Sequence, residues 1–93
     1  MKSSRLRFTP EATRLIVKLP PEVKRFIRSA IDDLRKDPYT GPELVGEFAG
    51  FRSLKPRRYR IIYRMNEEES FVEIYHVGHR RDVYETLRAL LQS

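Results

Sequence analysis

The sequence predicts a small α+β domain in which two N-terminal helices cover one face of a mainly antiparallel sheet, with the element order β-α-α-β-β-β-α. Three observations support this class. Two helical patterns near the N-terminus are separated by a double proline, two strand patterns flank a polar turn, and another helical pattern ends the chain. Because 93 residues suffice for one hydrophobic core, residues 1–93 are expected to form a single domain.

The N-terminal elements are predicted from caps and from apolar spacing. Residues 5–8 alternate weakly and are expected to form a short strand, after which Thr9 provides a helix cap and Pro10 a first helical position. Pro20 and Pro21 end this helix and begin the next. The second helix has an apolar stripe, centred on Phe26, that is expected to lie in the core: Val23, Phe26, Ile27, Ala30, Ile31 and Leu34.

After a predicted loop at 39–50, the chain becomes rich in β-branched and aromatic residues. Segments 58–65 and 70–77 are expected to pair around a polar turn at 66–69, and residues from 83 onward have helical spacing. If Met65 lies opposite Ser70, side-chain alternation gives the hairpin two faces. The face toward the helices carries Tyr59, Ile61, Tyr63, Met65, Val72, Ile74 and His76. The other face carries Arg60, Ile62, Arg64, Glu73 and Tyr75, together with Ser53 and Lys55 from the preceding segment.

This second face is polar and cationic, and two interpretations of it stay open. It forms a phosphate-binding concavity with Tyr75 as one wall, or it is an ordinary solvated face on which Arg60 and Arg64 form weak ion pairs with Glu73. The stretch 52–64 contains six basic residues and no acid. The whole chain has 19 Lys and Arg against 13 Asp and Glu, a net charge of +6, which favours a polyanion or an acidic protein as partner.

Several classes of protein and of site are disfavoured by the composition. No apolar run is long enough to span a membrane, and the polar start lacks the apolar stretch of a signal peptide, so a cytoplasmic protein without a membrane partner is expected. The absence of cysteine excludes disulfides and thiolate metal sites. His76 and His79 do not complete a metal-ligand pattern. We therefore expect neither a metal nor any other cofactor.

The remaining reactive groups are guanidinium, ammonium, imidazole and phenol. They suit phosphoryl chemistry on RNA, in which an enzyme holds a phosphate, stabilises its developing charge and moves a proton at the 2′-hydroxyl. An arginine binds phosphate through two N–H groups, and an aromatic ring stacks on an unpaired base. The candidate residues are Lys55, Arg60, His79, Arg80, Arg81 and Tyr84.

Two motifs resemble the paired signatures of the RelE/ParE toxin superfamily: Tyr-Arg-Ile-Ile-Tyr at 59–63 and Val-Gly-His-Arg-Arg-Asp-Val-Tyr at 77–84. Upstream, segments 36–41 and 44–46 resemble the family's Asp-Pro loop and its Leu-x-Gly stretch. The resemblance implies a RelE-like fold and a toxin of a bacterial toxin–antitoxin pair, with a cognate antitoxin protein as partner.

The resemblance also implies a choice between activities. RelE-like members cleave messenger RNA in the ribosomal A site, whereas ParE-like members inhibit DNA gyrase. We expect a ribosome-dependent, metal-independent endoribonuclease that inhibits translation, an mRNA interferase. A gyrase inhibitor without nuclease activity is the alternative, and a degenerate toxin that only binds its antitoxin is a third reading.

Residue roles implied by the resemblance follow by position. Arg60 matches the arginine that contacts the scissile phosphate. Arg80 matches a second arginine that stabilises charge or protonates the leaving oxygen. Tyr84 matches the aromatic residue that orients a nucleotide, and Lys55 matches a basic strand position.

One part of the family pattern is missing. Where ribosome-dependent members carry lysines that activate the 2′-hydroxyl, this chain has Phe51 and Ser53. We therefore expect His79, placed on the polar side of its strand, to be the general base, because imidazole has the pKa best suited to proton transfer near neutral pH. Lys55 is the alternative base.

Overall fold

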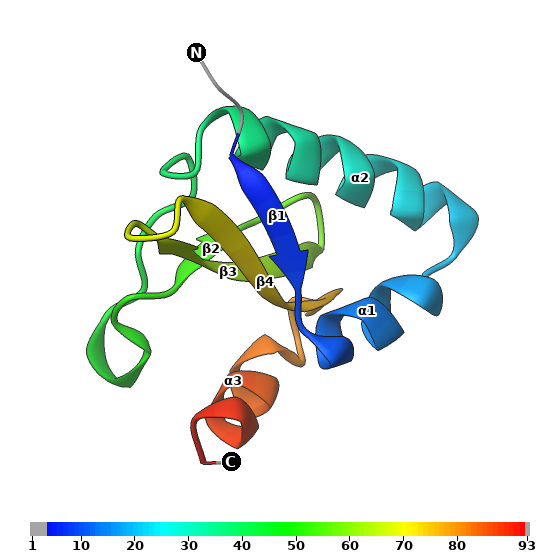
Figure 1. Cartoon of the computed structure of the whole chain (residues 1–93). Coiled ribbons are helices and arrows are strands. Elements are labelled where there is room, and N and C mark those ends of the chain that lie inside the picture. Colours follow the sequence, from blue (N-terminus) through cyan, green and yellow to red (C-terminus); the bar gives the residue numbers. More distant parts are fainter. Residues whose placement is uncertain (1–3, 93) are drawn as a thin grey trace.

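The structure, a computed structural model, describes residues 4–92 (Figure 1). Its elements are β1 (Arg5–Phe8), α1 (Pro10–Val17), α2 (Pro21–Lys36), the short 3-10 helix η1 (Gly46–Phe48), β2 (Arg52–Leu54), β3 (Tyr59–Asn66), β4 (Phe71–His79) and α3 (Val83–Gln92). The four strands form one sheet in the order β1-β4-β3-β2, in which β1 runs parallel to β4 and the other pairs are antiparallel. The predicted α+β class and element order are confirmed.

The two N-terminal helices cover one face of the sheet, as predicted. Thr9 caps α1, because its Oγ1 accepts a hydrogen bond from the Ala12 N–H at 3.1 Å. The main core lies between these helices and the sheet, and its buried members are Ala12, Val23, Ile27, Ile31, Leu34, Ile61, Tyr63, Val72, Ile74 and Val77. The prediction that Phe26 is at the centre of the helix stripe is wrong. Phe26 is only half-buried at the border of this core, whereas Ile27 and Leu34 are buried within it.

The hairpin register differs from the predicted one because of a longer turn and a bulge. The turn occupies 67–70 and ends at Ser70, which has a positive φ of 56°, so Met65 pairs with Val72 rather than with Ser70. Farther along, Tyr63 pairs with Ile74 but Ile62 pairs with His76. Tyr75 is the extra residue of this β-bulge, which inverts the side-chain alternation of β4 from His76 onward.

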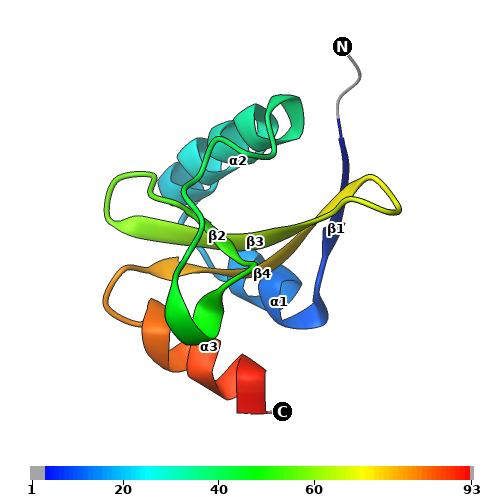
Figure 2. The same cartoon turned by 90° about the vertical axis from the view of Figure 1, so that its left-hand side faces the viewer.

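A second, smaller core lies on the opposite face of the sheet, between β3, α3 and the loop after α2. Its buried residues are Phe48, Phe51, Ile62, Val83 and Leu87. Figure 2 shows α2 and α3 on opposite sides of the strands. The face that was predicted to be polar is therefore partly covered by α3, and its open part is a pocket. Within residues 4–92, no helix is long and apolar enough to cross a membrane.

Candidate active site

A pocket of about 210 Å³ opens on the α3 side of the sheet. It lies between the loop that precedes η1, the strands β2 and β3, and the first turn of α3. Three of the six candidate residues, Lys55, Arg60 and Tyr84, line this pocket. Its complete lining is Pro42, Glu43, Leu44, Val45, Ser53, Lys55, Arg60, Ile62, Val83 and Tyr84.

Strand geometry places the two cations of the pocket. Ser53 pairs with Ile62 across β2 and β3, so the side chains of both residues point to the α3 side together with Arg60. The half-buried Arg60 donates hydrogen bonds from Nη1 to the carbonyl oxygens of Tyr59, at 2.7 Å, and of Arg57, at 3.3 Å. These two bonds hold the guanidinium at the pocket. Lys55 follows the end of β2 and is exposed.

Tyr84 brings an aromatic ring to the pocket from the first turn of α3. Its side chain is 54% exposed, and its ring centroid lies 6.0 Å from that of the buried Phe48. One side of the ring therefore rests on the smaller core, while the rest is open to a ligand. Such a partly supported ring is suited to stacking on a base.

The loop wall of the pocket is attached to the sheet by Tyr63 and Gly41. The buried Tyr63 hydroxyl accepts a hydrogen bond from the Gly41 N–H at 3.0 Å. A Cβ atom on Gly41 would lie 2.8 Å from the carbonyl oxygen of Ser53 and 2.9 Å from Tyr63 Oη, so only glycine fits. Arg52 Nη1 also donates to the Gly41 carbonyl oxygen at 2.8 Å. Burial raises the pKa of the Tyr63 phenol, which therefore stays neutral.

His79 does not line this pocket. It pairs with Tyr59 on the helix side of the sheet, where the two ring centroids are 5.7 Å apart, and its Nδ1 accepts a hydrogen bond from the Arg81 N–H at 3.2 Å. The expectation that His79 lies on the polar side with Lys55 is wrong, because the bulge at Tyr75 inverts the alternation. Arg80 is exposed in the following turn, and its backbone N–H donates to the Arg58 carbonyl at 2.8 Å.

Tyr75 is not a wall of the pocket either. Its hydroxyl donates to Glu73 Oε1 and accepts from Arg64 Nη2, both at 2.7 Å. The Arg64 guanidinium lies 4.9 Å from the centroid of the Phe51 ring, and Phe51 meets Tyr75 edge-on. Burial and the bond to Glu73 raise the pKa of Tyr75. Arg64 and Glu73 are thus connected through a tyrosine hydroxyl, at a place separate from the pocket lining.

His76 is buried, as the sequence predicts, but on the opposite face from the expected one. It pairs with Ile62, and a Cβ atom on Gly78 would lie 2.8 Å from its Nε2. Its side chain is 2% exposed, and neither ring nitrogen has a hydrogen-bond partner among the residues that the structure describes. Burial lowers the pKa of His76, opposed by the negative charges of Asp82 and Glu11.

Sequence reasoning missed Glu43, which lines the pocket beside the two cations. Glu43 reaches this position through an isolated antiparallel bridge to Arg52, whose Nη2 lies 3.8 Å from the Glu43 carboxylate. The Leu-x-Gly stretch at 44–46 directly follows Glu43 in the sequence. No local pattern there indicates that Glu43 pairs with Arg52 of β2. Within residues 4–92, no three His, Asp or Glu side chains come together as a metal site.

Comparison with known proteins places the chain in a family. A family model described as the ParE toxin of type II toxin–antitoxin system, parDE, matches residues 6–84. The chain belongs to the RelE/ParE toxin superfamily. This RelE/ParE toxin is 38% identical over 81 residues to Toxin RelG of Mycobacterium tuberculosis, which covers 85% of this chain and 93% of that protein.

Solved structures agree with this assignment. The toxin–antitoxin complex RelBE2 from Mycobacterium tuberculosis contains a chain that is 35% identical to this RelE/ParE toxin, with a TM-score of 0.76, and the match covers 83% of this chain and 98% of that one. The intact RelBE complex of E. coli matches at 20% identity with a TM-score of 0.74, over 83% of this chain and 96% of that one. The similarity to the E. coli complex, at 20% identity, concerns the fold alone.

Proposed function

We propose that this toxin is an endoribonuclease that cleaves messenger RNA on the ribosome and thereby inhibits translation in the cytoplasm. The observation that carries the proposal is the convergence of three residues on one pocket: Arg60 from β3, Lys55 from just after β2, and Tyr84 from α3. Two cations and an aromatic ring are the groups that bind a phosphate and stack on a base.

Each residue has a distinct task in this reaction. The 2′-oxygen attacks the adjacent phosphorus, the bond from phosphorus to the 5′-oxygen breaks, and negative charge builds on the phosphate oxygens. Arg60, held by two carbonyl groups, binds these oxygens through its other N–H groups. Tyr84 holds the nucleotide. The leaving 5′-oxygen takes up a proton, and the family motif assigns its stabilisation to Arg80, which lies exposed in the turn before α3 and outside the pocket lining.

The proton of the 2′-hydroxyl needs an acceptor, and we assign this task to Lys55 rather than to His79. Lys55 lines the pocket, whereas His79 lies beside Tyr59 on the helix side of the sheet. A general base must lie within hydrogen-bond reach of the proton that it removes, directly or through one water. The position in the pocket therefore favours Lys55 as the base, whereas the intrinsic pKa values of the two residues favour His79.

Single-turnover cleavage of messenger RNA on programmed ribosomes tests the proposal. We expect Lys55→Ala to slow the chemical step by about 10²-fold or more, the usual loss for a general base, while His79→Gln cleaves close to the parent rate. Ribosome association, measured by pelleting, should persist in both variants. A parent protein that leaves messenger RNA intact would refute the function. A dead His79→Gln variant beside an active Lys55→Ala variant would refute the assignment of the base.

Gyrase inhibition is the second candidate, and one observation favours it. Phe51 and Ser53, at the positions of the family's lysines, are only 6% and 3% exposed. Phe51 belongs to the smaller core and Ser53 offers only a hydroxyl group to the pocket, so neither position supplies a basic group. A plasmid supercoiling assay with purified gyrase distinguishes the two functions. Inhibition of supercoiling without any cleavage of ribosome-bound messenger RNA would establish the alternative.

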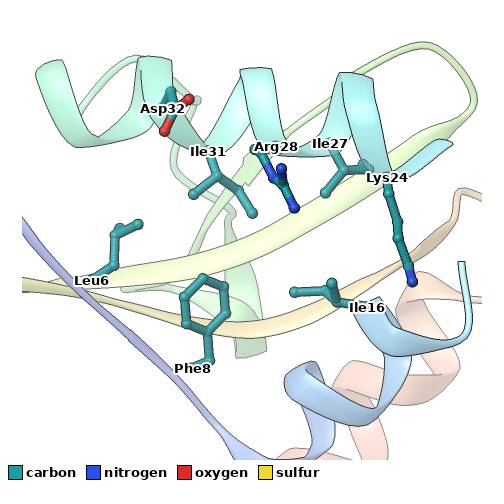
Figure 3. A pocket seen from close by; sticks show the side chains of 8 residues that line it. All are labelled: Leu6, Phe8, Ile16, Lys24, Ile27, Arg28, Ile31 and Asp32. Carbon is teal, nitrogen blue, oxygen red and sulfur yellow. The ribbon is translucent and has the colours of Figure 1, made fainter. Parts of the chain in front are cut away.

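A cognate antitoxin is the proposed protein partner, as in the RelBE2 and RelBE complexes of the relatives. The surface best suited to it is a groove of about 250 Å³ between β1, α1 and α2. Figure 3 shows apolar side chains of all three elements pointing into this groove, with charged side chains of α2 beside them: Leu6, Phe8, Ile16, Ile27 and Ile31, then Lys24, Arg28 and Asp32. An antitoxin segment with apolar anchors and acidic residues would fit this groove.

Co-purification of the two chains expressed from their native operon tests this partnership. Substitution of Phe8 by a charged residue should weaken the complex, because Phe8 is 40% exposed and its ring enters the groove. An antitoxin that binds the Phe8→Glu variant as tightly as the parent would place the interface elsewhere.

A further inference from the structure

Two arginine-rich turns meet at one end of the sheet. The first is the connection between β2 and β3, with Arg57 and Arg58, and the second is the turn between β4 and α3, with Arg81. Figure 2 shows both turns at the same end of the strands. They are joined by the hydrogen bond from the Arg80 N–H to the Arg58 carbonyl and by the pairing of Tyr59 with His79. We call Arg57, Arg58 and Arg81, with the rings of Phe26 and Tyr59, the turn surface.

The turn surface is positively charged and has few acids to balance it. In the part of the chain that the structure describes, the ion pairs made by arginine involve Arg7, Arg14, Arg52 and Arg88, and none involves an arginine of the turn surface. Glu22 borders the surface and Asp82 follows it in sequence, but neither lies within ion-pair distance of its guanidinium groups. These charges are therefore available to an anionic partner.

The surface is hollowed and built on aromatic rings. A depression of about 320 Å³ is lined by Glu22, Val23, Phe26, Arg57, Arg58 and Tyr59. The Arg57 guanidinium lies 4.6 Å from the centroid of the Phe26 ring, while Tyr59 meets both Phe26 and His79 edge-on at 5.7 Å. The cation–π contact holds the Arg57 guanidinium beside the Phe26 ring and leaves N–H groups for a ligand.

Arg57 occupies a backbone conformation that arginine rarely adopts. Its φ is +57°, in the left-handed region where glycine carries no penalty and other residues cost about 1 kcal/mol or more. Glycine would occupy this turn position with less strain. The arginine found there instead places its guanidinium on Phe26. The same carbonyl group of Arg57 accepts the bond from Arg60 Nη1, so the turn surface begins where the active-site pocket ends.

We propose that the turn surface is a second RNA-binding site, which holds the phosphate backbone of the strand that enters the pocket. The pocket lies on the α3 side of the sheet and the turn surface extends to the α2 side, so a bound strand bends around the end of the sheet where the two turns meet. Guanidinium groups at a hollow lined by aromatic rings are suited to single-stranded RNA, because they bind phosphates and stack with bases. The identity of this ligand rests on the proposed function.

Binding of an uncleavable RNA tests the site without any cleavage step. The probe is a fluorescent 2′-O-methyl oligouridine of twelve nucleotides, and anisotropy gives its dissociation constant at several salt concentrations. The test variant is Arg57→Gln with Arg58→Gln. The control variant is Arg35→Gln with Lys36→Gln, which removes the same charge from exposed positions of α2. Melting temperatures of both variants are compared with that of the parent.

We expect the test variant to bind roughly tenfold more weakly and to lower the slope of log affinity against log salt by about 1.4, twice the ~0.7 of one single-strand phosphate contact. The control should change the slope much less. Equal losses in both variants would mean diffuse attraction by net charge and would overturn the proposal. Unchanged RNA affinity with weakened antitoxin binding would make the surface a protein interface and also overturn it. If parent ribosome assays show no cleavage while the test variant still loses RNA affinity, the proposed function fails and the RNA site stands.

Discussion

Two backbone carbonyls, those of Tyr59 and Arg57, hold the Arg60 guanidinium at the pocket. We predict that Arg60→Ala abolishes growth arrest on induction, with a cleavage rate lowered by about 10²-fold or more, because a fixed cation stabilises the charge that develops on the phosphate. The fold should survive, since the side chain is not a member of either core.

Arg64→Ala is the matched control for this prediction. Arg64 lies on the same strand but bonds to Tyr75 and is absent from the pocket lining. Growth assays, immunoblots and melting curves compare the two variants. Full toxicity of Arg60→Ala at normal expression would refute the assignment of the pocket.

His76 should make stability depend on pH in a definite direction. Burial lowers the pKa of His76 below the ~6.5 of an unfolded chain, although Asp82 and Glu11 oppose the shift, so the unfolded state binds the proton more readily. The free energy of unfolding is then highest above about pH 6.5 and falls as pH decreases through the window down to the folded pKa. The slope is at most about 1.4 kcal/mol per pH unit.

Urea denaturation at several values between about pH 5 and 7 measures this dependence. His76→Leu, which cannot titrate, should give a flatter curve in the same window. An identical pH dependence in both proteins would show that another group is responsible.

For individual residues, the sequence was enough to assign Lys55, Arg60 and Tyr84 to one site, because motif positions and strand alternation are local properties. His79 and Tyr75 were misplaced for one physical reason. A single extra residue in β4 inverts the alternation, and the pairing that creates it involves β3, which no local pattern reveals.

The loop between α2 and η1 is held by the buried hydrogen bond from Gly41 to Tyr63. We predict that Tyr63→Phe lowers the free energy of unfolding by about 1–3 kcal/mol, because it leaves the Gly41 N–H buried without its partner. Tyr75→Phe should cost less, since its hydroxyl bonds to partners near the surface that water can replace.

Urea denaturation gives both free energies, and hydrogen exchange at the Gly41 amide reports the loop directly. Faster exchange at Gly41 is expected in Tyr63→Phe only. Equal exchange rates in the two variants would mean that the loop is held by other contacts.

Elements with strong local signals were predicted well, and this loop was not. Thr9, Pro10 and the double proline define α1 and α2 through caps and breakers, so their bounds follow from neighbouring residues. The loop owes its shape to Tyr63 and Arg52, residues far along the chain, and its wall of the pocket could not be derived from segment 39–50 alone.

The molecule has two cores of unequal size, on opposite faces of one sheet. We predict that Ile27→Ala destabilises the whole fold by about 2–5 kcal/mol, because it leaves a cavity where α2 meets the sheet. Phe26→Ala should cost less, since Phe26 is half-buried and contacts the exposed Arg57. Urea denaturation of the two variants checks the order. A larger loss from Phe26→Ala would restore the prediction made from the apolar stripe.

The parallel pairing of β1 with β4 sets when the sheet can be completed during synthesis of the chain. The first strand made by the ribosome finds its partner only when residues 71–74 have emerged, and Tyr84 follows later still. Contacts between such distant segments form late, because the chain must lose the entropy of closing a long loop before these contacts can stabilise it. A nascent or truncated chain therefore lacks an assembled pocket. The pocket proposed as the active site is completed only after Tyr84 has left the ribosome, late in the synthesis of the chain.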